Sequence, residues 1–413
     1  MDSLAALRDD TLRYFTDGTV RRRDPIGPAR ELVRTAPLLR LGGAWVASSH
    51  HLVSTLSVDR RLSMDARDIG REIRFAEPEG LNHVFGLMLN VRDGADHRRL
   101  RRLTTGVFSA RRTAELTTTV TGLVGATLDQ VGAEGLLDVI GDLGVTLPVR
   151  MNCELLGVRA QDTEQVLVWA KTLIRQINRT GQTQAELADA ERVLAELTAY
   201  VTDLIAVRGR DPGEDIVSRL VAAHRKDIIT GEELLAFVIT LLMNGLDTLT
   251  AALGSLLHTV LGQPGLLPRL TDAGLARAAF DEAMRLCSPV RVGARTVTED
   301  LSVAGQRIPA GSVVILYWAA ANRDPGFVAR PDEFRLDRGS LKSYAFGHGM
   351  HHCLGAPLAT LAGAEVLRQL AVRFPCAFVD LGGETLTWQD GLPFCAPQRL
   401  FVRLAVSPAM AVV

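Results

Sequence analysis

The sequence predicts a mainly α-helical fold with a smaller β-rich portion. Apolar residues recur three and four positions apart through most of 112–225, the spacing that places them on one face of a helix. Residues 230–261 form a long apolar stretch that begins with a threonine and two glutamates, which predicts a single helix roughly 45 Å long. Between 288 and 320, alternating apolar residues and glycine-containing turns predict strands.

The remaining elements follow from local patterns. A helix is expected over 28–35, strands over 38–41 and 44–47 around a Gly42-Gly43 turn, and a helix over 49–56. Residues 65–96 have poor periodicity, which indicates a long loop with a short helix. Further helices are expected over 114–131, 135–156, 162–178, 184–207 and 275–286, and further strands over 378–379, 386–388 and 400–404. We expect one domain over 1–413, with its β-rich portion at about 27–60, 288–320 and 376–405.

The composition is that of a globular chain and argues against several classes of protein. With 413 residues, 47% hydrophobic and 23% charged, the chain can bury a large core. A formal net charge of −1 argues against a nucleic-acid binder driven by overall charge. The N-terminal residues carry acids and arginines, and apolar runs such as 234–243 are too short to span a bilayer. We therefore expect a soluble, cytoplasmic monomer with no nucleic-acid or membrane partner.

The five cysteines are odd in number and irregularly spaced, which favours a reducing compartment over a disulfide framework. One of them, Cys353, follows a glycine-rich loop at 346–352 and precedes a helix expected near Pro357. There the helix dipole and free N–H groups favour a thiolate, a strong ligand for iron. A buried structural cysteine beside a turn is the alternative. Zinc is disfavoured, because the adjacent side chains of His351 and His352 point apart and no second ligand pair such as CxxC is nearby.

The segment FGHGMHHCLG resembles the haem-binding loop of the cytochromes P450, the haem-thiolate monooxygenases, whose pattern is FGxGxHxCxG. All six fixed positions are met, at Phe346, Gly347, Gly349, His351, Cys353 and Gly355. The resemblance implies that family's triangular helical domain, with haem b (iron protoporphyrin IX) between the long helix and the helix after the loop. It also implies Cys353 as the iron ligand, Phe346 beside the cofactor, and His351 at a haem propionate.

His97 and Arg101 are four residues apart and share one face of an expected helix. A solvated basic face is the simpler interpretation, but the pair matches the HxxxR that binds haem propionates in the resembled family. The other arginines of this helix, Arg98, Arg99 and Arg102, cannot all share that face, and some of them are expected to form a basic patch where an acidic redox partner could dock. Residues 93–96, DGAD, stand where the family often has Pro-Pro, and we expect a looser approach to the helix.

In the centre of the long apolar stretch, Gly245 and Asp247 are locally unfavourable in a helix. Gly there costs about 1 kcal/mol relative to Ala, and a buried carboxylate needs partners, so a functional site is indicated, with a cap or kink as the alternative. The segment resembles the (A/G)GxDT motif of the family's oxygen-binding groove. The resemblance implies that Gly245 lets a ligand approach, and that Thr248 bonds a carbonyl one turn back and delivers protons with Asp247. Asn244 departs from the usual Ala or Gly and would place an amide near substrate or oxygen.

Glu282 and Arg285 are three apart on an expected helix, where an exposed pair would contribute only about 0.3–0.5 kcal/mol. Their position resembles the family's ExxR pair, which braces the fold behind the haem, and Arg335, rather than Arg323, is the expected third member. In the extended stretch after this helix, Arg295 matches a further propionate-binding arginine. Alternation places Arg291 on the same face. It either faces the substrate pocket or bonds a nearby carbonyl or acid, and the second is favoured.

Together these motifs imply a monooxygenase that inserts one oxygen atom from O2 into a small, largely apolar organic substrate, by hydroxylation or epoxidation in secondary metabolism. No flavin or nicotinamide domain is visible, so a ferredoxin and a ferredoxin reductase are the expected electron donors. Expected pocket residues are Phe85, Leu87, Leu242, Met243, Asn244, Leu246, Val290, Arg291, Val292 and Phe394. A haem-thiolate peroxygenase and a haem-binding sensor or carrier without turnover are the alternatives, and Asp247 with Thr248 argues against both.

Overall fold

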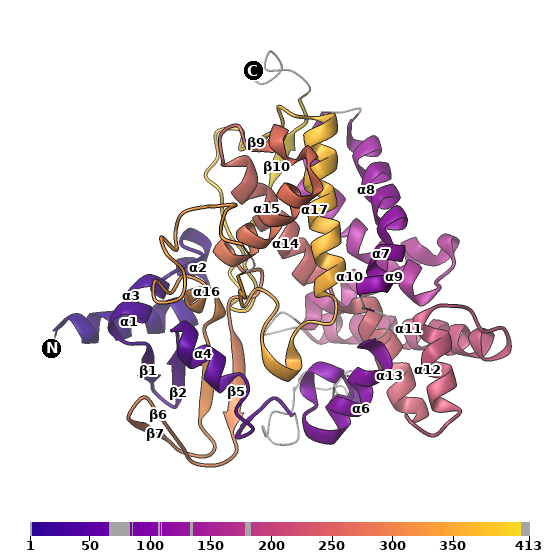
Figure 1. The fold of residues 1–413 in the computed structure, drawn as a ribbon. Coiled ribbons are helices and arrows are strands. Elements are labelled where there is room, and N and C mark those ends of the chain that lie inside the picture. The colour runs from indigo at the N-terminus through magenta and orange to yellow at the C-terminus, as the bar shows by residue number, and fades with distance from the viewer. Residues whose placement is uncertain are drawn as a thin grey trace. The chain divides into compact units, whose positions relative to one another are not determined.

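The computed structural model describes residues 2–65, 83–84, 86–105, 108, 110–132, 135–177, 183–339 and 341–405, and Figure 1 shows its helices and strands. The chain folds into two compact units, each built from segments far apart in the sequence. Unit 1 comprises Met1–Ser63, Glu115–Val145 and Thr248–Val413, and unit 2 comprises Met64–Ala114 and Thr146–Asp247. The expectation of a single domain stays a prediction.

Unit 1 contains all of the strands in the described part of the chain. Its largest sheet has the order β1-β2-β8-β5-β3, in which β2 runs parallel to β8 and the other neighbours are antiparallel. A second sheet has the order β4-β10-β9, and β6 and β7 form a hairpin. The strands are β1 (Leu38–Leu41), β2 (Ala44–Ala47), β3 (Leu62–Ser63), β4 (Leu136–Asp138), β5 (Gly293–Val297), β6 (Leu301–Val303), β7 (Gln306–Ile308), β8 (Val313–Leu316), β9 (Phe378–Asp380) and β10 (Phe401–Arg403).

The helices of unit 1 vary in length, from 4 residues in α16 to 18 residues in α17. They are α1 (Asp2–Thr16), α2 (Gly18–Arg23), α3 (Ala29–Thr35), α4 (His50–Leu56), α8 (Thr117–Gly132), α15 (Ala273–Leu286), α16 (Trp318–Ala321) and α17 (Ala356–Arg373). Trp45 and Val314 of the large sheet pack with Leu52 of α4 in one apolar core. Gly363 allows α17 to approach α15, since a Cβ there would stand 2.3 Å from the Phe280 ring.

Among its described residues, unit 2 contains helices and connecting segments but no strand. Its helices are α6 (Gly94–Thr105), α9 (Thr146–Leu156), α10 (Thr163–Ile177), α11 (Gln184–Arg210), α12 (Ile216–His224) and α13 (Gly231–Met243). Capping boxes start α11 and α13: the hydroxyls of Thr183 and Thr230 accept from the amides of Glu186 and Glu233, whose carboxylates accept from the threonine amides. Two helices cross between the units in sequence, α7 (Ala110–Glu115) and α14 (Leu246–Leu261).

Most expected elements are confirmed, and the exceptions have physical causes. The predicted helix over 135–156 is wrong at its start: β4 and a π-helical turn, Val139–Gly144, precede α9. The Asp138 carboxylate accepts the amides of Ile140 and Gly141 and ends β4, which is held by pairing with β10. The predicted strand over 386–388 is also wrong, because Trp388 makes only an isolated bridge to Pro397.

Candidate functional site

The loop before α17 presents Cys353 at the surface of unit 1. Gly347 (φ 71°) and Gly349 (φ 72°) adopt left-handed backbone angles, which favour glycine. A Cβ on Gly349 would also stand 2.7 Å from the Ser57 carbonyl oxygen. The Cys353 amide donates to the Phe346 carbonyl at 2.9 Å, which closes the loop, and Cys353 is exposed. The expected loop architecture is therefore present.

Cys353 fits a prosthetic group better than a metal site built by protein side chains alone. Among the described residues, no three His, Cys, Asp or Glu side chains gather into a group that could hold a metal ion. A single accessible thiolate can instead bind an iron whose other ligands come from a macrocycle. Gly355 caps α17 and Pro357 lies in its first turn, so the thiol lies next to a helix N-terminus that favours negative charge. These residues fit haem b.

Three further predicted cofactor contacts also belong to unit 1. Arg295 lies in β5 and is 4% exposed, and its Nη1 donates to the Ala294 carbonyl at 2.8 Å. His351 is half-buried and ends the 3-10 turn that precedes Cys353. The half-buried Phe346 ring lies 6.4 Å from the Phe280 ring, centroid to centroid. Their contacts with a cofactor stay predictions.

In unit 2, His97 and Arg101 lie one turn apart on α6, as the spacing predicted. His97 is 1% exposed and Arg101 is half-buried. The approach to this helix is tied down, so the expectation of a looser approach is wrong. The Asp93 carboxylate accepts the amides of Met64 at 2.6 Å and Asp65 at 3.1 Å, and the Asp65 carboxylate accepts the Asp93 amide at 3.3 Å. Asp93 therefore fixes the approach to α6 through hydrogen bonds, in a segment where the resembled family often has the more rigid Pro-Pro.

The other arginines of α6 divide into two kinds. Arg98 and Arg102 are exposed. Arg99 instead donates to both carboxylate oxygens of Glu233, at 2.6 and 3.0 Å, and this hydrogen bonding holds the pKa of Glu233 below its usual value. Of the three arginines, Arg98 and Arg102 therefore remain available for the expected basic patch, because the charge of Arg99 is paired with the N-terminal turn of α13.

The long helix predicted over 230–261 is two helices. α13 ends at Met243, Asn244 is extended (ψ 141°), and Gly245 has φ 91° before α14 begins. The side-chain amide of Asn152 in α9 donates to the Asn244 carbonyl at 2.8 Å, which satisfies a group that the break exposes. The cap considered as an alternative is thus present, and a continuous helix is wrong. Asn152 was not predicted as a functional residue, and its one signal in the sequence is an amide between two apolar residues.

Asp247 and Thr248 lie in the first turn of α14, and both are half-buried. An acid in this turn is favoured by the helix dipole, so the break removes the local penalty that the sequence indicated for Asp247. No hydrogen bond from the Thr248 hydroxyl to a carbonyl one turn back occurs among the described residues. The change of backbone direction instead comes from Gly245. The roles of Asp247 and Thr248 in proton delivery stay predictions.

The predicted pocket residues differ in their surroundings. Val290 and Phe394 meet in an isolated antiparallel bridge within unit 1, although they are far apart in the sequence. In unit 2, Leu242, Met243 and Leu246 are each at most 3% exposed, and Asn244 is exposed. Leu87 and Val292 are half-buried, and Phe85 lies outside the described residues.

Arg291 has a structural role in unit 1. It is 0% exposed, and its guanidinium donates to the carbonyls of Pro25 at 3.0 Å, Gly391 at 2.8 Å, and Phe394. Of the two interpretations left open, bonding to carbonyls is therefore correct, and the expected substrate contact is wrong. Arg291 holds the C-terminal loop that carries Phe394.

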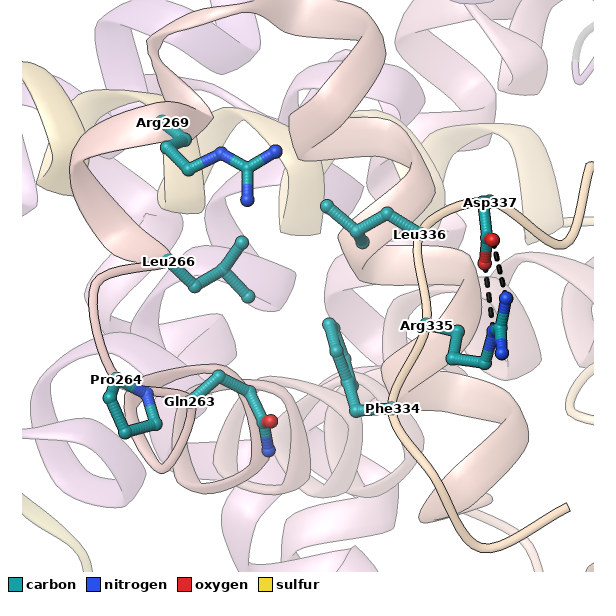
Figure 2. Close-up of a pocket in the computed structure, with 8 residues that line it drawn as sticks. All are labelled: Gln263, Pro264, Leu266, Arg269, Phe334, Arg335, Leu336 and Asp337. Carbon is teal, nitrogen blue, oxygen red and sulfur yellow. Dashed lines mark hydrogen bonds and ion pairs between the residues drawn. The ribbon is translucent and has the colours of Figure 1, made fainter. Parts of the chain in front are cut away.

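Glu282 and Arg285 form the expected buried pair on α15, with 2.8 Å between Arg285 Nε and Glu282 Oε2. The third charged partner is Arg338, whose Nε donates to Glu282 Oε1 at 2.8 Å. The prediction of Arg335 is wrong: only its backbone amide reaches Glu282, at 3.0 Å, while its guanidinium pairs with Asp337. Figure 2 shows this pair pointing towards each other.

The pocket in Figure 2 has a volume of about 420 Å³. It belongs to unit 1 and is lined by Gln263, Pro264, Leu266, Arg269, Phe334, Arg335, Leu336 and Asp337. None of the residues predicted to contact substrate is among them, so this pocket does not support those predictions.

Comparisons with known proteins agree with the motifs. A family model described as Cytochrome P450 matches residues 208–378. The erythromycin C-12 hydroxylase of Saccharopolyspora erythraea is 32% identical, over 94% of this chain and 93% of the relative. The nocardicin C N-oxygenase of Nocardia uniformis subsp. tsuyamanensis is 33% identical, over 86% and 88%. The crystal structure of CalO2 is similar with a TM-score of 0.87 and 28% identity, over 93% of this chain and 97% of that one. Because the similarity at these identities spans most of both chains, the chain belongs to the cytochrome P450 family, the haem-thiolate monooxygenases whose prosthetic group is haem b.

Proposed function

We propose that this monooxygenase hydroxylates or epoxidises a small, largely apolar organic molecule of secondary metabolism. The observation that carries the reaction class is Cys353, exposed on a glycine loop at the start of α17. The secondary-metabolic setting is supported by relatives named as an erythromycin C-12 hydroxylase and a nocardicin C N-oxygenase. The bridge between Val290 and Phe394 supports an apolar lining from the C-terminal loop.

Haem b, when bound, supplies the redox-active iron at which O2 is reduced. In our proposal the Cys353 thiolate would be the protein ligand of that iron and would donate electron density to it. In unit 1, Arg295 and His351 would bind propionate carboxylates through charge-assisted hydrogen bonds. In unit 2, His97 and Arg101 match the HxxxR motif, which has the same role in the resembled family. Burial of Arg295 and His97, at 4% and 1% exposure, limits competition from water and strengthens such bonds.

Protons are supplied by the first turn of α14. The Asp247 carboxylate takes up a proton, and the Thr248 Oγ1 passes it towards the reacting oxygen. Gly245, which carries no side chain, leaves room for the ligand at the helix break. These roles are supported by the half-buried positions of Asp247 and Thr248 directly after the break.

Members of this bacterial group take electrons from redox partners, and we propose a ferredoxin with its reductase. Arg98 and Arg102, exposed on α6, would dock an acidic ferredoxin surface. The stretch Gly231–Leu261 has the length and hydropathy of a membrane span, but its most apolar 18-residue part is 67% buried inside the protein. This burial supports a cytoplasmic location.

The ligation test is the spectrum of the reduced, carbon-monoxide-bound protein. A thiolate-type band is expected for the wild type and for Cys376→Ser, and its loss is expected for Cys353→Ser. A histidine-type band in the wild type would overturn the assignment of Cys353.

The proton-delivery test compares Thr248→Ala with Thr250→Ala during turnover with ferredoxin, ferredoxin reductase and a substrate found by screening compounds for a shift of the haem absorption band. Thr250 is a matched control because it lies on the same helix and its hydroxyl is committed to the Gly144 carbonyl. Thr248→Ala should lower product formed per electron consumed, while Thr250→Ala should retain it. Unchanged yield in Thr248→Ala would remove the proposed role.

A further inference from the structure

Two cysteines from distant parts of the chain meet inside unit 1. Cys287 caps the C-terminus of α15 and Cys395 lies in the C-terminal loop, and their sulfur atoms are 3.5 Å apart. A disulfide bond is about 2.05 Å long, so the sulfurs need to move together by only about 1.5 Å, a distance that side-chain rotation can supply.

The backbone on both sides of this contact is fixed. The Cys395 amide donates to the Pro289 carbonyl at 2.8 Å, and the Ser255 hydroxyl donates to the Cys395 carbonyl at 2.9 Å. The adjacent residues Val290 and Phe394 form the antiparallel bridge already described. The short sulfur–sulfur distance is therefore a product of the fold, since hydrogen bonds hold each segment against the other.

The charges around the two sulfurs differ in their effect. Hydrogen bonding from the Cys287 thiol, with the positive charges of Arg291 and Arg323, lowers the pKa of Cys395 to about 7. The same contact with Cys395, together with burial, raises the pKa of Cys287. One nitrogen of the buried Arg291 guanidinium, Nη2, makes no hydrogen bond among the described residues. A thiolate on Cys395 would therefore provide a negative charge to balance the positive charge of Arg291. Cys395 is thus suited to be the nucleophile and Cys287 the proton donor.

The other cysteines lack this arrangement. Cys153, in unit 2, is buried and desolvation raises its pKa to about 12, which makes it unreactive. Cys376 is half-buried, and Cys353 is the proposed iron ligand. In the described part of the chain, Cys287 and Cys395 are the two cysteines whose sulfur atoms contact each other.

We propose that Cys287 and Cys395 are a reversible dithiol–disulfide modification site, oxidised by hydrogen peroxide. The Cys395 thiolate attacks one peroxide oxygen, the O–O bond breaks, and a sulfenic acid and hydroxide form. The Cys287 sulfur then attacks the Cys395 sulfur, and the oxygen of the sulfenic acid leaves as a second hydroxide. The two thiol protons convert both hydroxides to water, so two thiols and one peroxide give one disulfide and two waters. Because Cys395 is only 3% exposed, a small neutral oxidant fits this site better than a bulky disulfide.

The direct test uses the wild-type holoenzyme. It is treated with hydrogen peroxide, quenched with catalase and alkylated in denaturant, so that the modified thiols can be counted by mass. Of the five cysteines in the chain, all five should be alkylated before treatment and three afterwards, with full recovery on reduction. Five alkylated cysteines after treatment would overturn the proposal.

Peptide mapping identifies the bond. Trypsin leaves Cys287 in peptide 286–291 and Cys395 in peptide 374–399, which also contains Cys376. The Cys376→Ser variant should still give the 286–291/374–399 cross-link, which then assigns it to Cys395. A cross-link that disappears in Cys376→Ser would refute the pairing.

The division of roles is tested with dimedone, which traps sulfenic acids. In Cys287→Ser the resolving thiol is absent, so peroxide should produce a dimedone adduct on Cys395 in most molecules. In Cys395→Ser the adduct on Cys287 should be at least several-fold weaker. An adduct that is stronger on Cys287 would reverse the assignment, and the wild-type measurements above need neither variant to fold.

Discussion

Glu282→Ala should destabilise unit 1 far more than removal of an exposed acid on the same helix. Glu282 is 5% exposed and accepts four hydrogen bonds, two from Arg285, one from Arg338 and one from the Arg335 amide. The substitution removes the carboxylate that both guanidinium groups contact, and these side chains are 1% exposed for Arg285 and 8% exposed for Arg338. Breaking a buried pair in this way costs about 3–5 kcal/mol.

Two features of the structure place the value within that range. Arg285 retains bonds to the carbonyls of Asn322 at 2.9 Å and Pro331 at 2.7 Å, so its N–H groups are not left wholly unsatisfied. Two guanidinium groups, however, lose the same carboxylate. We therefore expect a loss of about 4 kcal/mol, a large fraction of the roughly 5–15 kcal/mol that stabilises a typical native protein.

The assay is urea unfolding followed by circular dichroism, with all proteins at equal haem occupancy because a bound cofactor adds its own stabilisation. Asp281→Ala is the matched control, since Asp281 pairs with Arg277 on α15 and the side chains are 51% and 59% exposed. That change should cost about 0.3–0.5 kcal/mol. If Glu282→Ala costs no more than the control, the buried network does not brace the fold and the reasoning fails.

Three further predictions concern single residues. Glu233→Gln should cost about 1 kcal/mol at neutral pH, allowing for partial exposure. Because the hydrogen bond from Arg99 lowers the folded-state pKa of Glu233 below 4.5, this stabilisation is present above pH 4.5 and is lost as the pH falls through the folded-state value. In urea titrations, a difference in unfolding free energy between wild type and variant that stays constant with pH would contradict this prediction. Gly245→Ala should cost about 1–2 kcal/mol because of its φ of 91°, whereas Gly122→Ala, exposed within α8, should stabilise by about 0.5–1 kcal/mol. If both variants change the melting temperature equally, the positive φ of Gly245 does not explain the cost of its substitution. Arg291→Met leaves buried carbonyls unpaired and should cost about 2–4 kcal/mol, and a loss below 1 kcal/mol in urea unfolding would show that Arg291 does not hold the C-terminal loop.

Features specified by local chemistry were predictable from the sequence. The turn at Gly42-Gly43 and the helix over 49–56 are predicted from a few neighbouring residues, and both strands and the helix are confirmed. The Cys353 loop is equally local, because its glycines adopt angles that few other residues tolerate.

Features decided by distant contacts were not predictable in this way. Residues 136–138 are predicted as helix but form β4, because the pairing partner β10 lies far along the chain. Arg338 and Arg335 are three residues apart in an irregular segment, where no periodicity indicates which guanidinium reaches Glu282. Arg291 was ambiguous for the same reason, since its carbonyl partners come from the two ends of unit 1.

The parallel pairing of β2 with β8 imposes an order on biosynthesis. Trp45 pairs with Val314, so at a translation rate of about 5–20 residues per second β2 emerges roughly 13–54 s before its neighbour. The last segment of unit 2 ends at Asp247, which precedes β5 and β8. On the ribosome, unit 2 therefore has its full set of segments while the large sheet of unit 1 still has an open edge. An open strand edge invites pairing with other chains, so the nascent chain is most exposed to aggregation during this interval.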